Sequence, residues 1–166
     1  MVTDEELAEL YYRTTLELAD GEGVVWDITP TEAPGMSPLA VLVPFSHAFI
    51  LTAENPESAG DYTPEQNAEA TKALGADVAA RGIPHRPCPG YGFDVDHVEH
   101  GFALLATDDT ASEIRGLALE LAHSYRQNAI FHLSDAGLGI IGALRSEMSA
   151  VRPVRLSRAE GRPASR

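Results

Sequence analysis

Three candidate helix starts in the 166-residue sequence share one pattern, a threonine followed three residues later by a glutamate or glutamine. In this arrangement each side chain binds the free backbone amide of the other residue, which marks the first turn of a helix. The pairs are Thr3 with Glu6, Thr63 with Gln66, and Thr110 with Glu113. The sequence therefore predicts three helices, with room for several strands between them.

Apolar side chains at helical spacing follow each start. After Thr3 they predict a helix that continues to a stop at Asp20-Gly21. Pro64 stands at the first helical position of the second helix, where its missing amide does no harm, and Gly82 ends that helix. The inward faces are Leu7, Leu10, Tyr11, Thr14 and Leu18; then Asn67, Thr71, Leu74 and Val78; then Ile114, Leu117, Ala118, Leu121 and Tyr125.

Short apolar or β-rich runs bounded by turn residues predict the strands. They are residues 24–28, 47–53, 98–106, 129–133 and 138–144, and residues 86–93 offer one more. Ser134 to Gly137 predicts the turn of an antiparallel hairpin. From His47 onward, the order strand, helix, optional strand, strand, helix, strand is the split βαβ pattern.

The fold class that follows is α+β. We expect a mixed or antiparallel sheet of about five or six strands backed by helices, with a ferredoxin-like order as one option and an extra N-terminal helix and strand. One hydrophobic core serves up to roughly 250 residues, so the sequence predicts a single α/β domain over residues 1–151. Residues 152–166 hold five arginines against Glu160, a net charge of +4, and predict a flexible basic tail.

Charge and hydropathy exclude several classes of function. The net charge of −13, of which residues 1–151 carry −17, argues against nucleic-acid binding, because such proteins present a basic face to phosphates. The longest apolar run, residues 39–51, is broken by Pro44 and His47 and is shorter than the ~20 residues that span a bilayer. The N-terminus lacks a secretory signal pattern, so we expect a cytoplasmic protein. The lone Cys88 is a poor candidate for a nucleophile.

Several short motifs carry a resemblance to a known family. They are Tyr12-Arg13-Thr14, Thr52-Ala53-Glu54-Asn55-Pro56, Asn67 in the next helix, Glu99 with Phe102, and Gln127-Asn128-Ala129. With these motifs the chain resembles the family catalogued as domain of unknown function 3293, over roughly Tyr11 to Leu144. It departs from the family's usual Pro-Ser at His100-Gly101. The resemblance implies a shared α/β domain of bacteria and their phages, and it brings no reaction, ligand or cofactor.

The first candidate site lies where the strand that ends at Thr52 to Asn55 meets the N-terminus of the helix that begins at Thr63. Free amides and the positive helix end favour anions there, and open α/β sheets bind ligands beyond strand ends. Asn67 shares the inward face of that helix, so we expect its amide to find partners near the same place. The alternative is that Asn55 and Asn67 serve only to tie the loop to the helix.

A second group of polar residues is Asp94, Asp96, His97, Glu99 and His100. In an extended segment His97 and Glu99 share a face, which makes them weak candidates for a metal site, while the other residues point away or suit a solvated loop. Glu99 alone is the candidate general base, and the small residues beside it form a surface that either lies under a helix or opens onto a ligand. Gln127 and Asn128, between a helix and a strand, either contact a ligand or end the helix.

Three functions follow from these residues. The first is a binding or interaction domain whose ligand-binding residues are Thr52, Asn55, Asn67, Glu99, Gln127 and Asn128, because amides recognise ligands more often than they transfer protons. The second is an enzyme that acts on a small phosphorylated or nucleotide-like substrate with Glu99 as base. The third is an acidic mimic that docks a basic protein. A small anionic ligand suits the first two, and the oligomeric state stays open.

Overall fold

Helices and antiparallel strands make up the chain, which confirms the predicted α+β class. The computed structural model describes residues 3–92, 98–145 and 149–159. In chain order the elements are α1 (Asp4–Tyr12), β1 (Thr15–Ala19), β2 (Val25–Pro30), α2 (Leu39–Leu42), β3 (His47–Thr52), the 3-10 helix η1 (Pro56–Ser58), α3 (Pro64–Ala80), β4 (His85–Pro87), β5 (Gly90–Tyr91), β6 (Val98–Glu99), β7 (Gly101–Ala106), α4 (Ala111–Ser124), β8 (Ala129–Ser134), β9 (Gly137–Gly142), β10 (Ser149–Arg152) and β11 (Val154–Arg158).

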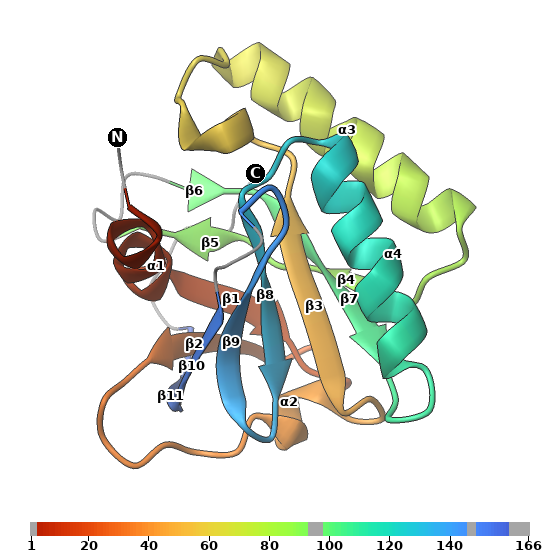
Figure 1. Ribbon diagram of the computed structural model, residues 1–166. Coiled ribbons are helices and arrows are strands. Elements are labelled where there is room, and N and C mark those ends of the chain that lie inside the picture. Colours follow the sequence, from red (N-terminus) through yellow and green to blue (C-terminus); the bar gives the residue numbers. More distant parts are fainter. Residues whose placement is uncertain (1–2, 93–97, 146–148, 160–166) are drawn as a thin grey trace.

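The strands form two sheets, whereas the sequence predicted one. The 6-stranded sheet has the order β10-β9-β8-β3-β7-β4, and the 5-stranded sheet has the order β11-β2-β1-β5-β6. Figure 1 shows α3 and α4 side by side along the larger sheet, and the smaller sheet with α1 on the opposite side. Within the larger sheet, β8-β3-β7-β4 and the two helices follow the strand-helix-strand-strand-helix-strand order that was one option for this fold.

Strand β3, in the middle of the 6-stranded sheet, is buried on both faces. Successive side chains of a strand point to opposite faces, so Phe49 and Leu51 pack towards α3 and α4, while Ala48 and Ile50 pack towards the 5-stranded sheet. All four are buried. Burial on both sides explains why this strand reads as a continuous apolar run rather than as an alternating one.

Two of the three predicted capping boxes are present. Thr3 with Glu6 and Thr63 with Gln66 each exchange both side-chain hydrogen bonds, and Gly82 follows α3 with a φ of 66°. At the third start, Thr110 makes no side-chain cap; its hydroxyl accepts a hydrogen bond from the Thr107 amide instead. Helix α4 forms because its apolar face is buried, and it begins without the predicted cap.

The first helix is shorter than predicted. Helix α1 ends at Tyr12, and the chain continues as β1, in which Leu16 and Leu18 are buried at alternate positions. A separation of four residues, as between Thr14 and Leu18, satisfies both the helical repeat and the strand repeat of two. The apolar spacing therefore could not show where the helix gives way to the strand.

The predicted strand at residues 98–106 is divided at His100. Val98–Glu99 pairs within the 5-stranded sheet as β6, and Gly101–Ala106 pairs within the 6-stranded sheet as β7. A side chain at Gly101 would bring its Cβ to 2.5 Å from the Leu51 carbonyl oxygen. A glycine here therefore lets the chain pass from one sheet to the other in close contact with β3.

The predicted hairpin is confirmed, and the predicted start of the tail is wrong. Strands β8 and β9 pair antiparallel around the turn, and Gly137 has a φ of 115°. Val154–Arg158, placed in a flexible tail by its charge, forms β11 and pairs with β2 because Val154 is buried in the core. Residues 160–166 lie outside the described residues. One domain over residues 1–151 stays a prediction.

None of the helices described by the structure is both long and apolar enough to span a bilayer.

Candidate functional site

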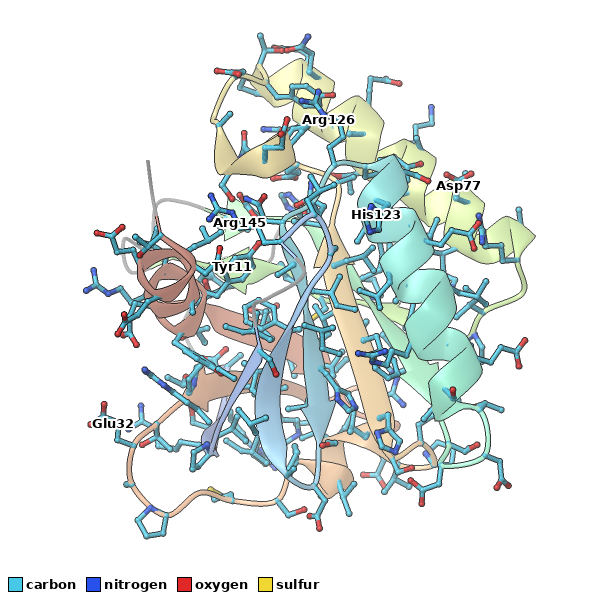
Figure 2. All side chains as sticks on the ribbon, viewed as in Figure 1. Tyr11, Glu32, Asp77, His123, Arg126 and Arg145 are labelled. Atoms are coloured by element: carbon cyan, nitrogen blue, oxygen red, sulfur yellow. The ribbon has the colours of Figure 1, made fainter. Side chains whose placement is uncertain are left out.

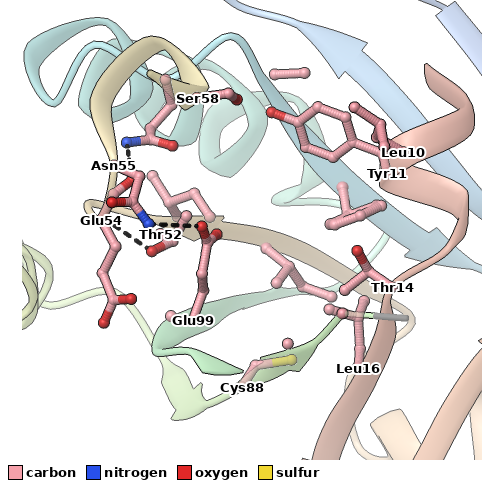
Figure 3. Close-up of a pocket in the computed structure, with 18 of the residues that line it drawn as sticks. Leu10, Tyr11, Thr14, Leu16, Thr52, Glu54, Asn55, Ser58, Cys88 and Glu99 are labelled. Atoms are coloured by element: carbon pink, nitrogen blue, oxygen red, sulfur yellow. Dashed lines mark hydrogen bonds between the residues drawn. The ribbon is translucent and has the colours of Figure 1, made fainter. Parts of the chain in front are cut away.

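A cavity of about 390 Å³ lies at the end of β3, between the two sheets and beside α1. Ligand sites in proteins are clefts of ~300–1,000 Å³ with mostly apolar walls and a few polar groups that fix orientation. Figure 3 shows the two sides: Leu10, Thr14 and Leu16 on one, and Thr52, Asn55 and Glu99 on the other. The cavity therefore has an apolar wall that faces a polar one.

Four of the six predicted ligand-binding residues line this cavity, and the other two stand behind it. Thr52, Asn55, Glu99 and Gln127 belong to the wall. Asn67 and Asn128 do not line the cavity, but each hydrogen-bonds to a residue that does. The structure thus brings together side chains that are up to 76 residues apart in the sequence, from Thr52 to Asn128.

Asn55 connects α3 to the cavity wall. Its backbone amide donates to Asn67 Oδ1 at 2.9 Å, and Asn67 Nδ2 donates to Asn55 Oδ1 at 3.2 Å. Its own side-chain amide donates to Glu99 Oε1 at 3.1 Å. Asn67 therefore fixes the side chain of Asn55, and Asn55 in turn orients the carboxylate of Glu99.

The predicted anion site at the start of α3 is not part of the cavity. Neither Thr63 nor Pro64 lines the cavity. In addition, the capping box of Thr63 and Gln66 already satisfies two backbone amides at the N-terminus of α3. The cavity is bounded instead by the loop between β3 and α3.

That loop holds three non-glycine residues in the left-handed region of backbone conformation. The φ angles are 45° for Asn55, 56° for Glu57 and 57° for Ser58. Each such residue costs of order 1–3 kcal/mol unless the surrounding structure enforces it, and such residues gather at active sites and ligand clamps. Two of the three, Asn55 and Ser58, line the cavity.

The segment between α4 and β8 holds the strained loop in place. The buried Gln127 donates through Nε2 to the carbonyl oxygens of Glu54, at 3.1 Å, and Tyr125. Asn128 donates to Ser58 Oγ at 3.3 Å. The Glu57 amide donates to the Arg126 carbonyl at 2.8 Å, and the Arg126 guanidinium, labelled in Figure 2, pairs with the Glu57 carboxylate.

Glu54 is a buried carboxylate of the cavity wall that the sequence analysis did not include in the site. Its Oε1 accepts hydrogen bonds from Thr71 Oγ1, the His100 amide and His100 Nδ1, each at 3.2 Å. Its side chain is 7% exposed. Because three donors converge on one oxygen, Glu54 ties β3 to α3 and to the crossing between the sheets.

Tyr11 forms part of the wall opposite the loop, and Figure 3 shows its hydroxyl directed towards Ser58. Burial, together with the negative charge of Glu99, raises the pKa of Tyr11 to about 12, although hydrogen bonds with Ala129 and Ser58 and the charge of Arg145 act the other way. The phenol is therefore protonated at neutral pH.

Cys88 also lines the cavity, and it is buried and free. Burial, and to a smaller extent the charge of Glu17, raises the pKa of its thiol well above the usual range. A thiol that stays protonated is a weak nucleophile, so Cys88 forms apolar wall.

The metal candidates receive no support in the described part of the chain. His97 lies outside the described residues, and the described His, Cys, Asp and Glu side chains form no group of three that could hold a metal ion. Glu99, the other candidate, accepts a hydrogen bond from the side-chain amide of Asn55.

Tyr11, Arg13, Thr14, Glu54 and Ser58 line the cavity but were not predicted to do so. Arg13, Thr14 and Glu54 stand in the short motifs of the family resemblance, so those motifs were the signal that could have found them. Tyr11 and Ser58 carried no such signal, because only the docking of α1 against the loop brings them together.

Comparison with known proteins gives one match. Residues 51–130 match the family described as a protein of unknown function (DUF3293), so the chain resembles that family over this range. The match confirms the predicted resemblance over a shorter stretch than expected, since Tyr12-Arg13-Thr14 lies outside it. No curated protein and no solved structure matches the chain.

Proposed function

We propose that this protein is a small-molecule binding domain whose site is the cavity at the end of β3. The observation that carries the proposal is the position of the motif residues. Arg13, Thr14, Thr52, Asn55 and Glu99 come from three of the short motifs, and all of them line this one cavity. Residues needed only for folding have no reason to gather around an open space.

The rigid wall of the cavity supports the same proposal. A loop with three left-handed residues is held by hydrogen bonds from Asn67, Gln127 and Asn128. A site that is already shaped avoids the ordering cost that a flexible site would incur when the ligand binds. We propose that the protein acts in the cytoplasm, which agrees with its single, unpaired Cys88.

Enzymatic action with Glu99 as base and docking of a basic protein to the acidic body both stay predictions. Glu99 lines the cavity, where it would contact a substrate.

The proposal can be tested by filling the cavity. Thr14 is half-buried and lines the cavity, and Thr31 is half-buried and does not. A fragment library is screened by ligand-observed nuclear magnetic resonance against the wild type, Thr14→Phe and Thr31→Phe. We expect fragments that bind the wild type and Thr31→Phe and are lost in Thr14→Phe. Either an empty screen of the folded wild type or hits that Thr14→Phe retains would overturn the proposal.

A further inference from the structure

The two sheets that the structure describes have four edge strands, and three of them are protected against pairing with another chain. A free edge offers unpaired N–H and C=O groups, which proteins guard with charges, proline, short strands or covering loops. Strand β6 has two residues, and β4 has three residues and ends at Pro87. Strand β11 carries Arg155 and Arg158, and the Met36 amide already donates to its Val154 carbonyl at 2.8 Å.

Strand β10, the fourth edge, lacks these protections. Its four residues include no proline, and it pairs with β9 on one side. In the described part of the chain, no backbone hydrogen bond joins β10 to a segment other than β9. The N–H and C=O groups on its other side are therefore open to a further strand.

The charge on β10 does not guard this edge either. Arg152 is the one charged residue of the strand, and its guanidinium lies over the Tyr12 ring, 4.2 Å from the centroid, and pairs with the Glu9 carboxylate. The arginine is thus turned towards α1 and neutralised there. Two copies of a chain with a net charge of −13 repel each other, and an edge whose own charge is balanced adds nothing to that repulsion.

Val151 gives the edge an apolar contact surface. Its side chain is 61% exposed, the highest value among the large apolar side chains of the described residues. Because side chains alternate along a strand, Val151 and Ala150 point to opposite faces, and Ala150 packs against the core. Opposite residues of an antiparallel pair point to the same face, so in a twofold-symmetric pair Val151 can lie opposite its own copy and not opposite Ala150.

We infer that this protein forms a twofold-symmetric dimer in which β10 pairs antiparallel with β10 of a second copy, with the two Val151 side chains opposite each other. Such an edge is self-complementary, because antiparallel pairing places the N–H groups of each copy opposite the C=O groups of the other. The 6-stranded sheet continues across both copies. Strands of four residues make an interface at the weak end of the range, below ~1,200 Å², so the dimer forms at high protein concentration and dissociates on dilution.

The test is the mass of the protein in solution, measured by light scattering after size-exclusion chromatography at ~10 µM to ~1 mM protein. Val43, which is 57% exposed and follows α2, provides the matched control. We expect the wild type and Val43→Lys to approach twice the 17.8 kDa of one chain, and Val151→Lys to stay at the mass of one chain. Thermal melts check that both variants fold. A wild type with the mass of one chain at every concentration overturns the dimer and leaves the edge to a strand of another protein; a dimer that Val151→Lys retains also overturns it.

Cross-linking tests the pairing itself. The single cysteine, Cys88, is buried, so Val151→Cys and Val43→Cys each add one exposed thiol. Side chains directly opposite each other in an antiparallel pair have Cβ atoms ~4.5–5.5 Å apart, close enough for a disulfide after a small movement. We expect oxidation to join Val151→Cys into a covalent dimer at least ~10-fold faster than Val43→Cys, because the pairing holds the two thiols together. Equal rates for the two variants overturn the pairing through β10.

Discussion

Removing the Asn67 side chain should loosen the wall of the cavity by an amount that the structure allows us to work out. Asn67→Ala deletes two part-buried hydrogen bonds to Asn55, of 2.9 and 3.2 Å. At ~1 kcal/mol each these bonds contribute ~2 kcal/mol, and alanine returns ~0.5 kcal/mol through its better helix propensity. We therefore expect the free energy of unfolding to fall by about 1.5 kcal/mol, which for a chain of this size lowers Tm by roughly 3–6 °C.

The single tryptophan, Trp26 in β2, provides the assay, because urea unfolding can be followed by its fluorescence. Glu69→Ala is the matched control, two residues further along α3 and exposed, and it should leave the unfolding midpoint near that of the wild type. Asn67→Asp keeps the acceptor for the Asn55 amide and loses the donor to Asn55 Oδ1, so it should show about half of the loss. Our reasoning is refuted if Asn67→Ala unfolds at the same urea concentration as the control.

Three further predictions concern the surroundings of the site. Gly101→Ala places a Cβ 2.5 Å from a carbonyl oxygen and should destabilise the protein by about 1–3 kcal/mol. The control is Gly116→Ala in α4, whose Cβ would meet nothing within 4 Å and which should raise Tm. Equal Tm values for the two variants in a thermal melt would contradict this account. Burial, and then the charges of His47 and Arg115, lower the pKa of His132 to about 4. The contribution of His132 to the free energy of unfolding should therefore be complete above pH ~6.5, the pKa in the unfolded chain, and should be lost as the pH falls towards 4. In urea titrations at several pH values, His132→Phe should flatten this pH dependence, and an unchanged dependence would exclude His132 as its source. Cys88 should react with a maleimide only after denaturant is added, and rapid labelling of the native protein, read by mass spectrometry, would show that the thiol is accessible.

The parts of the fold that the sequence predicts are those determined by neighbouring residues. Helix α3 has its cap, its proline at the first turn, its inward face and its closing glycine within 20 residues, and the structure shows all of them. The hairpin at Gly137 is local in the same sense. The division of the strand at His100 between two sheets depends on partners far along the chain, so no short-range pattern could have predicted it.

The candidate site shows the same limit. The inward position of Asn67 follows from helical spacing, and its contact with Asn55 follows from the short connection between β3 and α3. Tyr11 joins the cavity only because α1 packs across the end of the sheets, a contact that local spacing cannot reveal. Glu54 was not among the predicted site residues, because the residues that donate to it, Thr71 and His100, are 17 and 46 residues away in the sequence.

The most direct test of the central claim is to add, to isotope-labelled protein, the fragment that binds the wild type most tightly in the screen and to follow the backbone amide signals. If the cavity at the end of β3 is the binding site, saturable shifts will concentrate on the residues around it, among them Thr14, Ser58, Glu99 and Ala129. Shifts that do not saturate, or that gather at the far end of the sheet around His47 and Asp108, would contradict the account.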